Sequence, residues 1–156
     1  MGRRWRYLTA WRDVCSRRVV GWYLVAQMPT GLVFHPLKQA LTLRQPASGL
    51  IVHADRGIQY RSTACRARVA QAGAVPSFGR LGNPCDNALP GTTQAEPEVP
   101  SKPNRCPTAP PFASLEEARL KAAYYLDTYF NLQRRRSALG YRSPHQFEQD
   151  LKSNLS

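Results

Sequence analysis

The sequence predicts an α/β fold, built around a mixed β-sheet with flanking helices. Stretches rich in aromatic and β-branched residues alternate with stretches in which apolar residues recur at helical spacing. In chain order they give a strand pair, a helix, a strand, a helix and a strand, which is typical of an α/β domain. A chain of 156 residues has room for one domain with one hydrophobic core.

Residues 5–26, WRYLTAWRDVCSRRVVGWYLVA, predict two antiparallel strands joined by a short turn. The polar break at residues 15–18 marks the turn. Asp13 comes just before this break, where an acidic side chain commonly caps a turn. We therefore expect a structural role for Asp13.

Residues 30–44 predict the first helix, because leucines recur there at near-helical spacing. Thr30 is a candidate N-cap, whereas Pro36 argues against a regular first turn. The apolar run from Leu50 to Ala54 then predicts a strand that stops at a polar segment containing Asp55.

Residues 62–73 predict the second helix, with Ser62 as a candidate N-cap and Gly73 as a terminator. Its expected apolar face consists of Cys65, Val69 and Ala72. The stretch AVPSF, residues 74–78, predicts a further short strand.

The composition changes near residue 84. Residues 84–111 hold eight of the chain's thirteen prolines and few apolar side chains. Each proline removes a backbone donor and fixes φ, so neither a helix nor an inner strand can continue at this density. Little apolar burial is available to offset the entropy of ordering. We expect residues 90–113 to be largely disordered and to separate residues 5–89 from residues 114–153.

A long helix is predicted after this segment. Ser114 and Glu117 have the spacing of a capping box, and Glu117 and Lys121 can pair one turn apart. The expected apolar stripe consists of Leu115, Ala118, Ala122, Tyr125, Leu126 and Tyr129. Three arginines, Arg134, Arg135 and Arg136, follow at the end where the helix dipole favours cations. They are either a solvated basic end or contacts for phosphate groups, and the sequence leaves both open.

The chain is strongly basic, with 22 Lys and Arg residues against 10 Asp and Glu and a formal net charge of +12. Such a surplus favours a polyanionic partner, nucleic acid ahead of an anionic membrane, although a solvated basic surface gives the same charge. No apolar run reaches the roughly 18 residues of a transmembrane helix, and no signal-peptide core follows the basic N-terminus. We expect a soluble cytoplasmic protein without a membrane partner. The four scattered cysteines form no C-x-x-C pair, and we assign them no function.

Four short motifs occur in order along the chain. They are DVCSRRVVGW at 13–22, HADRGIQY at 53–60, GNPCDNA at 82–88 and NLQRRRSALGYRSPHQF at 131–147. Together they resemble the catalytic core of bacterial insertion-sequence transposases of the DDE type, which are related to retroviral integrases. The resemblance implies an RNase H-like fold. Residues 5–89 would be a partial catalytic core, and residues 114–153 its C-terminal helical part.

The resemblance also implies a reaction that depends on metal ions. In this family two aspartates and a glutamate hold two divalent ions, usually Mg²⁺. One ion activates a water or a DNA 3′-hydroxyl, and the other steadies the leaving oxygen. Two dications about 3.5–4 Å apart repel each other, so several carboxylates are needed to hold them. Asp55 matches the family's second aspartate and is the expected catalytic residue and metal ligand.

The other two carboxylates have no counterpart in this sequence. The family's first aspartate lies on a strand ahead of the hairpin, and residues 1–4 contain no acid. The glutamate should follow Asp55 after thirty-five residues, and that position is Gly91. We therefore expect an incomplete RNase H-like sheet that lacks its first strand and the helix with the catalytic glutamate. Mg²⁺ should not be bound productively.

Candidate nucleic-acid contacts lie beside Asp55 and at the end of the long helix. They are His53, Arg56, Gln59, Tyr60, Arg134, Arg135 and Arg136. The leading hypothesis is a remnant of a DDE transposase core that has lost catalysis and keeps weak, electrostatic binding of DNA. The alternative is a non-enzymatic basic module that binds DNA or RNA, or pairs with an intact transposase. An active nuclease that uses Asp55 with unconventional partners ranks last.

Overall fold

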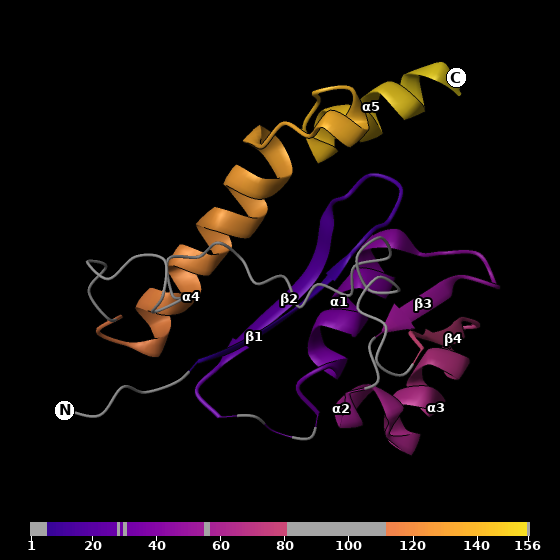
Figure 1. Ribbon diagram of the computed structural model, residues 1–156, viewed down its shortest axis with the longest axis vertical. Coiled ribbons are helices and arrows are strands. Elements are labelled where there is room, and N and C mark those ends of the chain that lie inside the picture. The colour runs from indigo at the N-terminus through magenta and orange to yellow at the C-terminus, as the bar shows by residue number, and fades with distance from the viewer. Residues whose placement is uncertain (1–5, 28, 30, 55–56, 81–111, 156) are drawn as a thin grey trace.

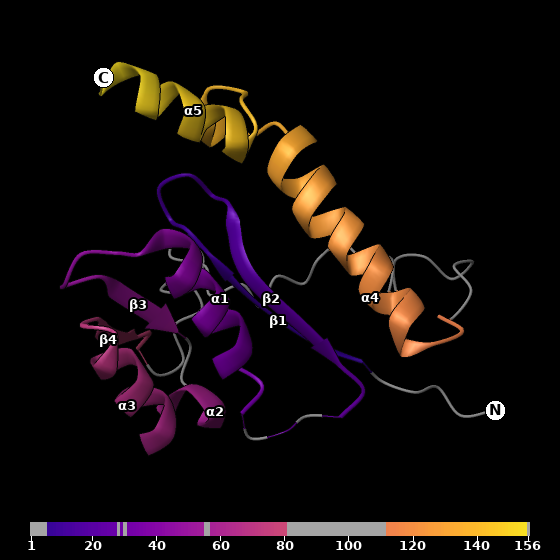
Figure 2. The same cartoon turned by 180° about the vertical axis from the view of Figure 1, so that it is seen from behind.

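A long β-hairpin lies between two groups of helices (Figure 1). The computed structural model describes residues 6–27, 29, 31–54, 57–80 and 112–155. On one side of the hairpin lie α1 and a small βαβ unit, and on the other side the C-terminal helices run along it. Figure 2 shows the same arrangement from behind.

The hairpin consists of β1 (Tyr7–Arg12) and β2 (Val19–Val25), paired antiparallel with Tyr7 opposite Val25, as predicted. A β-bulge interrupts the register between Trp11 and Arg12. At the turn, the Asp13 carboxylate accepts hydrogen bonds from the backbone N–H groups of Cys15, at 2.8 Å, and Ser16, at 3.1 Å. The predicted turn-capping role of Asp13 is thus confirmed.

Helix α1 (Phe34–Arg44) packs closely on β2. Its N-cap is Val33, so the helix begins after the predicted Thr30, which itself lies outside the described residues. Pro36 is tolerated because it falls in the first turn, where a missing N–H has no intrahelical partner to lose. Gly21 of β2 permits the close approach, since a Cβ there would lie 2.1 Å from the Pro36 carbonyl oxygen.

The βαβ unit contains four elements in chain order. They are β3 (Ile51–Ala54), α2 (Ile58–Arg61), α3 (Thr63–Gln71) and β4 (Val75–Phe78). The strands pair parallel, with His53 opposite Ser77. The Ser62 hydroxyl accepts from the Cys65 N–H at 3.2 Å, which confirms the predicted cap of α3. Gly73 follows α3 with a positive φ of 66°, a conformation that glycine adopts readily.

The strands form two separate ladders instead of one predicted mixed sheet. In the described part of the chain, β1 pairs only with β2 and β3 only with β4. A single hydrophobic cluster nevertheless joins the two ladders. It contains Trp11, Val20, Val33, Leu37, Ala40, Val52, Ala54, Tyr60, Cys65, Val69 and Ala74. Packing through α1, without strand pairing, therefore holds the hairpin beside the βαβ unit.

The predicted C-terminal helix has two geometries. It starts as α4 (Leu115–Ala123) and continues as a π-helix, η2 (Tyr124–Gln133). The Ser114 hydroxyl accepts from the Glu117 N–H at 3.0 Å, as the capping-box spacing predicts, and the Glu117 carboxylate accepts from the Ala113 N–H at 2.6 Å. The predicted Glu117–Lys121 ion pair is present at 2.6 Å.

The π-helix changes which residues face the hairpin. Hydrogen bonds in a π-helix span five residues, so the buried face shifts along the chain. Phe130 and Asn131 are buried, whereas Tyr129, predicted for the apolar stripe, is 41% exposed. Leu126 and Phe130 form a second hydrophobic cluster with Ala10 and Val19 of the hairpin.

The chain ends in a short 3₁₀ turn, η3 (Ser137–Leu139), and α5 (Pro144–Asn154). Ser143 and Gln146 make a complete capping box at the start of α5. Residues 81–111, with most of the proline-rich segment that we expect to be disordered, lie outside the described residues. Within the described ranges, no helix combines the length and the apolar character that crossing a membrane requires.

Candidate functional site

The first candidate site is the end of β3, which leads directly to Asp55. Asp55 and Arg56 themselves lie outside the described residues. Two residues earlier, the half-buried His53 ring places Nδ1 at 3.0 Å from the Ser77 hydroxyl of β4. The parallel pairing of β3 with β4 therefore fixes the imidazole at the strand end that precedes Asp55.

The other predicted residues of this site lie on α2. The backbone of Gln59 belongs to α2, but its side chain is not described. Tyr60 is only 7% exposed and packs edge-on against Trp11, with ring centroids 5.8 Å apart. The Tyr60 ring is thus part of the hydrophobic core. Its contact with nucleic acid remains a prediction, as does that of Gln59.

The described carboxylates do not form a metal site. Among the described residues there is no group of three or more His, Cys, Asp and Glu side chains that could hold a metal ion. Glu148 instead receives hydrogen bonds from Arg18 and Arg44. Asp127 accepts from the Trp22 indole at 3.1 Å, and burial raises the pKa of this carboxyl group. Asp55, the expected ligand, lies outside the described residues, so the expectation about bound Mg²⁺ stays a prediction.

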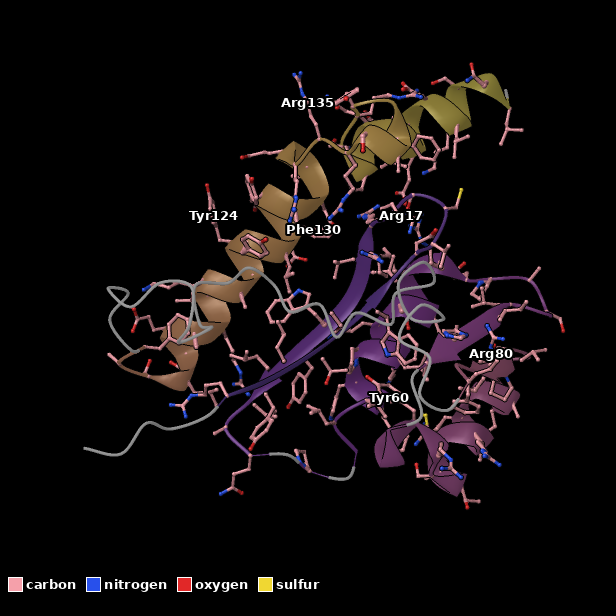
Figure 3. All side chains as sticks on the ribbon, in the orientation of Figure 1. Arg17, Tyr60, Arg80, Tyr124, Phe130 and Arg135 are labelled. Carbon is pink, nitrogen blue, oxygen red and sulfur yellow. The ribbon has the colours of Figure 1, made fainter. Side chains whose placement is uncertain are left out.

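The second candidate site is the end of η2, where the side chains of the three predicted arginines point in two different directions. The Arg136 guanidinium lies 4.3 Å from the centroid of the Phe130 ring, and that of Arg134 lies 5.7 Å from the same ring. Figure 3 shows Arg135 extending outward, away from Phe130. The structure therefore brings Arg134 and Arg136 together and leaves Arg135 exposed.

Two further arginines, which are not among the residues predicted from the sequence, complete this site. Arg12 at the end of β1 and Arg17 in the hairpin turn act electrostatically on Arg136, together with Arg134. Burial and these three positive charges lower the pKa of Arg136 to about 10. We call Arg12, Arg17, Arg134 and Arg136 the arginine cluster. The basic turn RDVCSRR was a possible signal, but the sequence does not show that this turn meets the end of η2.

An ion-pair network lies beside the arginine cluster. Arg18 donates to the Glu148 carboxylate at 2.8 Å, and Arg44 pairs with Glu148 and, at 3.2 Å, with Asp13. Burial alone would raise the pKa of Glu148, but hydrogen bonds from Arg44, Ser16 and Arg18 outweigh it and lower the pKa to about 2. This network ties the hairpin turn to α1 and α5.

Comparison with known proteins defines the class. Residues 1–84 match the family model described as "Integrase core domain". This match covers the hairpin, α1, the βαβ unit and the motif with Asp55. The chain therefore belongs to the integrase core domain family.

Similarity to individual relatives identifies the branch of the family. The chain is 37% identical to the transposase for insertion sequence element IS904 of Lactococcus lactis over 142 residues, which cover 91% of this chain and 54% of the relative. It is 36% identical to a putative transposase for insertion sequence element IS986/IS6110 of Mycobacterium tuberculosis over 137 residues, covering 82% and 46%. It is 33% identical to transposase InsF for insertion sequence IS3A of Escherichia coli over 144 residues, covering 92% and 48%.

These relatives confirm the resemblance to insertion-sequence transposases that the four motifs indicated. The chain spans about half the length of the curated relatives it matches. The activities of those full-length proteins are therefore only proposed for this chain.

Proposed function

We propose that this chain is the remnant of a DDE transposase core that no longer catalyses DNA cleavage or strand joining and keeps a weak, electrostatic affinity for DNA. The observation that carries the proposal is Gly91, which stands where the family pattern requires the catalytic glutamate. A glycine has no side chain to bind a metal ion or move a proton. The match to the integrase core family and the net charge of +12 support the DNA-related origin.

Loss of catalysis follows from the charge that a two-ion site needs. When bound, Mg²⁺ in this family polarises the scissile phosphate and activates the attacking oxygen. Asp55, at the end of β3, is the residue that would contact such an ion. One carboxylate cannot offset the repulsion between two dications.

We also propose that the two strand ladders belong to one incomplete RNase H-like sheet. The antiparallel β1–β2 ladder and the parallel β3–β4 ladder share one hydrophobic cluster, to which Trp11 of β1 and Val52 of β3 both belong. A strand between β1 and β3 would join the ladders into a single mixed sheet.

DNA binding is expected to arise from positive charge, with no reading of base sequence. The contacts that we propose are His53, Arg56, Gln59 and Tyr60 near the end of β3, and Arg134, Arg135 and Arg136 at the end of η2. Phosphate contacts release counterions, so log K should fall linearly with log salt, with a slope of about −0.9 for each phosphate neutralised.

A nicking assay and a binding assay together test the proposal. The protein is incubated with supercoiled plasmid and Mg²⁺, next to Asp55→Ala, and its affinity for two unrelated DNA duplexes is measured across a salt series. We expect no nicking above that of Asp55→Ala, and equal affinities for both duplexes that fall steeply with salt. Mg²⁺-dependent nicking that disappears in Asp55→Ala would contradict the loss of catalysis. Affinity that survives high salt would contradict the electrostatic mode.

A further inference from the structure

The arginine cluster has a rigid base. Phe130, at 6% exposure, is anchored in the second hydrophobic cluster, and the guanidinium groups of Arg134 and Arg136 lie over its ring. The backbone of Arg136 is held by an antiparallel bridge in which its N–H donates to the Arg142 carbonyl at 3.1 Å. Stacking on an aromatic ring and a fixed backbone limit the freedom of Arg136 before any ligand binds.

The hairpin supplies the other half of the cluster from a separate part of the sequence. Arg12 lies at the β-bulge that ends β1, and Arg17 lies in the turn with a positive φ of 61°. Figure 3 shows Arg17 at the tip of the hairpin, on the side of the hairpin that faces Phe130 of η2. Arginines from two elements therefore converge on one spot of the surface.

Burial and neighbouring positive charge act on two arginines of the cluster. Burial and the charge of Arg17 lower the pKa of Arg12, and burial with the charges of Arg134, Arg12 and Arg17 lowers that of Arg136. The Nε atoms of Arg12 and Arg136 are buried and make no hydrogen bond within the part of the chain that the structure describes. Glu148, on nearby α5, is already engaged by Arg18 and Arg44.

We propose that the arginine cluster, with Arg12 and Arg17 as residues not otherwise assigned, binds a phosphate group of the DNA backbone. The planar guanidinium forks of Arg12 and Arg136 suit a tetrahedral phosphate, which can accept several parallel N–H bonds. A bound phosphate would bring negative charge next to the guanidinium groups that converge there. The inference rests on the proposed function for its choice of DNA, and it makes the tip of the hairpin part of the DNA-binding surface.

The test compares single charge removals in the whole chain. Arg12→Gln, Arg17→Gln and Arg136→Gln are compared with Arg68→Gln, which removes an exposed arginine of α3 far along the chain from the cluster. The affinity for a DNA duplex is measured at several salt concentrations, and thermal unfolding verifies that each variant folds. We expect each cluster variant to weaken binding about tenfold and to reduce the salt slope by roughly 1, with little change in Arg68→Gln. Equal losses in all four variants would overturn the cluster as a site, while DNA binding itself would stand.

A second measurement separates this inference from the proposed function. Inorganic phosphate is titrated into the ¹⁵N-labelled wild-type protein, and the arginine Nε–H NMR signals are followed. We expect saturable shifts of Arg12 and Arg136 and none of Arg68. If the protein fails to bind DNA but these signals shift, the proposed function fails and the phosphate site holds. If phosphate shifts none of the cluster signals, or shifts Arg68 equally, the site is refuted.

Discussion

At the scale of single residues, Glu148 connects three segments of this chain, α5, the hairpin turn and α1. Its carboxylate lies on α5 and is only 12% exposed, yet it accepts from Arg18 of the hairpin turn and from Arg44 at the end of α1. Ion pairs at a surface contribute little, but partial burial reduces the competition from water. Two arginines that otherwise repel each other are therefore held together by one acid.

Replacing Glu148 by Gln should lower the free energy of unfolding by about 1–3 kcal/mol at pH 7, because two charge-assisted hydrogen bonds are weakened. The pKa of Glu148 falls from its ordinary value of 4.5 to about 2 on folding. Its stabilisation is therefore complete above about pH 5 and is lost as the pH falls toward 2. Urea unfolding from pH 7 to pH 3 should show a smaller loss of stability in Glu148→Gln than in the wild type.

The matched control is Asp150→Asn, which removes an exposed pair with Arg142 at 2.7 Å. Exposed pairs contribute about 0–1 kcal/mol, so this variant should stay close to the wild type. A Glu148→Gln variant as stable as Asp150→Asn, with an unchanged pH profile, would show that the network adds nothing to stability.

Single residues also show which features the sequence could predict. The Asp13 turn and the Ser62 cap were predicted correctly because each bond joins residues two or three positions apart. The arginine cluster was not, since Arg12 and Arg136 meet only after the hairpin has packed on η2. The Glu117 carboxylate also accepts from the Ala113 N–H, a bond that the capping-box pattern does not predict.

At the scale of elements, the π-helix η2 positions the C-terminal part on the hairpin. The wider turn of the π-helix places Asn131 beside Val19, the first residue of β2. The Asn131 side-chain amide hydrogen-bonds to the Val19 backbone as a neighbouring strand would. Asn131 accepts from the Val19 N–H and donates to the Val19 carbonyl, both at 2.9 Å. The α-helical spacing predicts Tyr129 at this face, whereas the π-helix places Asn131 there.

Asn131→Leu should destabilise the protein by about 2–4 kcal/mol, because it leaves both backbone groups of Val19 buried without partners. Leucine has a similar volume, so the loss reports the hydrogen bonds more than the packing. Chemical unfolding measures the cost, and hydrogen exchange at the Val19 amide should accelerate. Gln133→Leu, at an exposed position of the same helix, should change stability by less than about 0.5 kcal/mol. An unchanged Val19 exchange rate in Asn131→Leu would contradict this role.

At the scale of the whole molecule, the hairpin is shared by two hydrophobic clusters on its opposite faces. Side chains alternate along a strand, so neighbouring residues face opposite sides. Trp11 and Val20 accordingly join the cluster of α1 and the βαβ unit, whereas Ala10 and Val19 join the cluster of η2. The elements on each side were predictable from local patterns. Their attachment to one hairpin was not, because it depends on contacts such as that of Asn131 with Val19, 112 residues apart.

Because the hairpin serves both clusters, damage to one should destabilise the other. Leu126 is fully buried in the cluster of η2, and Leu126→Ala should cost about 2–5 kcal/mol. Trp11 reports on the cluster of α1 and Trp22 on that of η2, so ¹⁹F-labelled tryptophan follows both during urea unfolding. Both signals should lose their native positions at the same, lower urea concentration. Leu120→Ala, at a position 72% exposed, should leave both transitions within about 0.5 kcal/mol of the wild type. If Trp11 kept its native signal after Trp22 had lost its own, the two hydrophobic clusters would unfold independently. The C-terminal helices would then not be needed for folding of the cluster of α1.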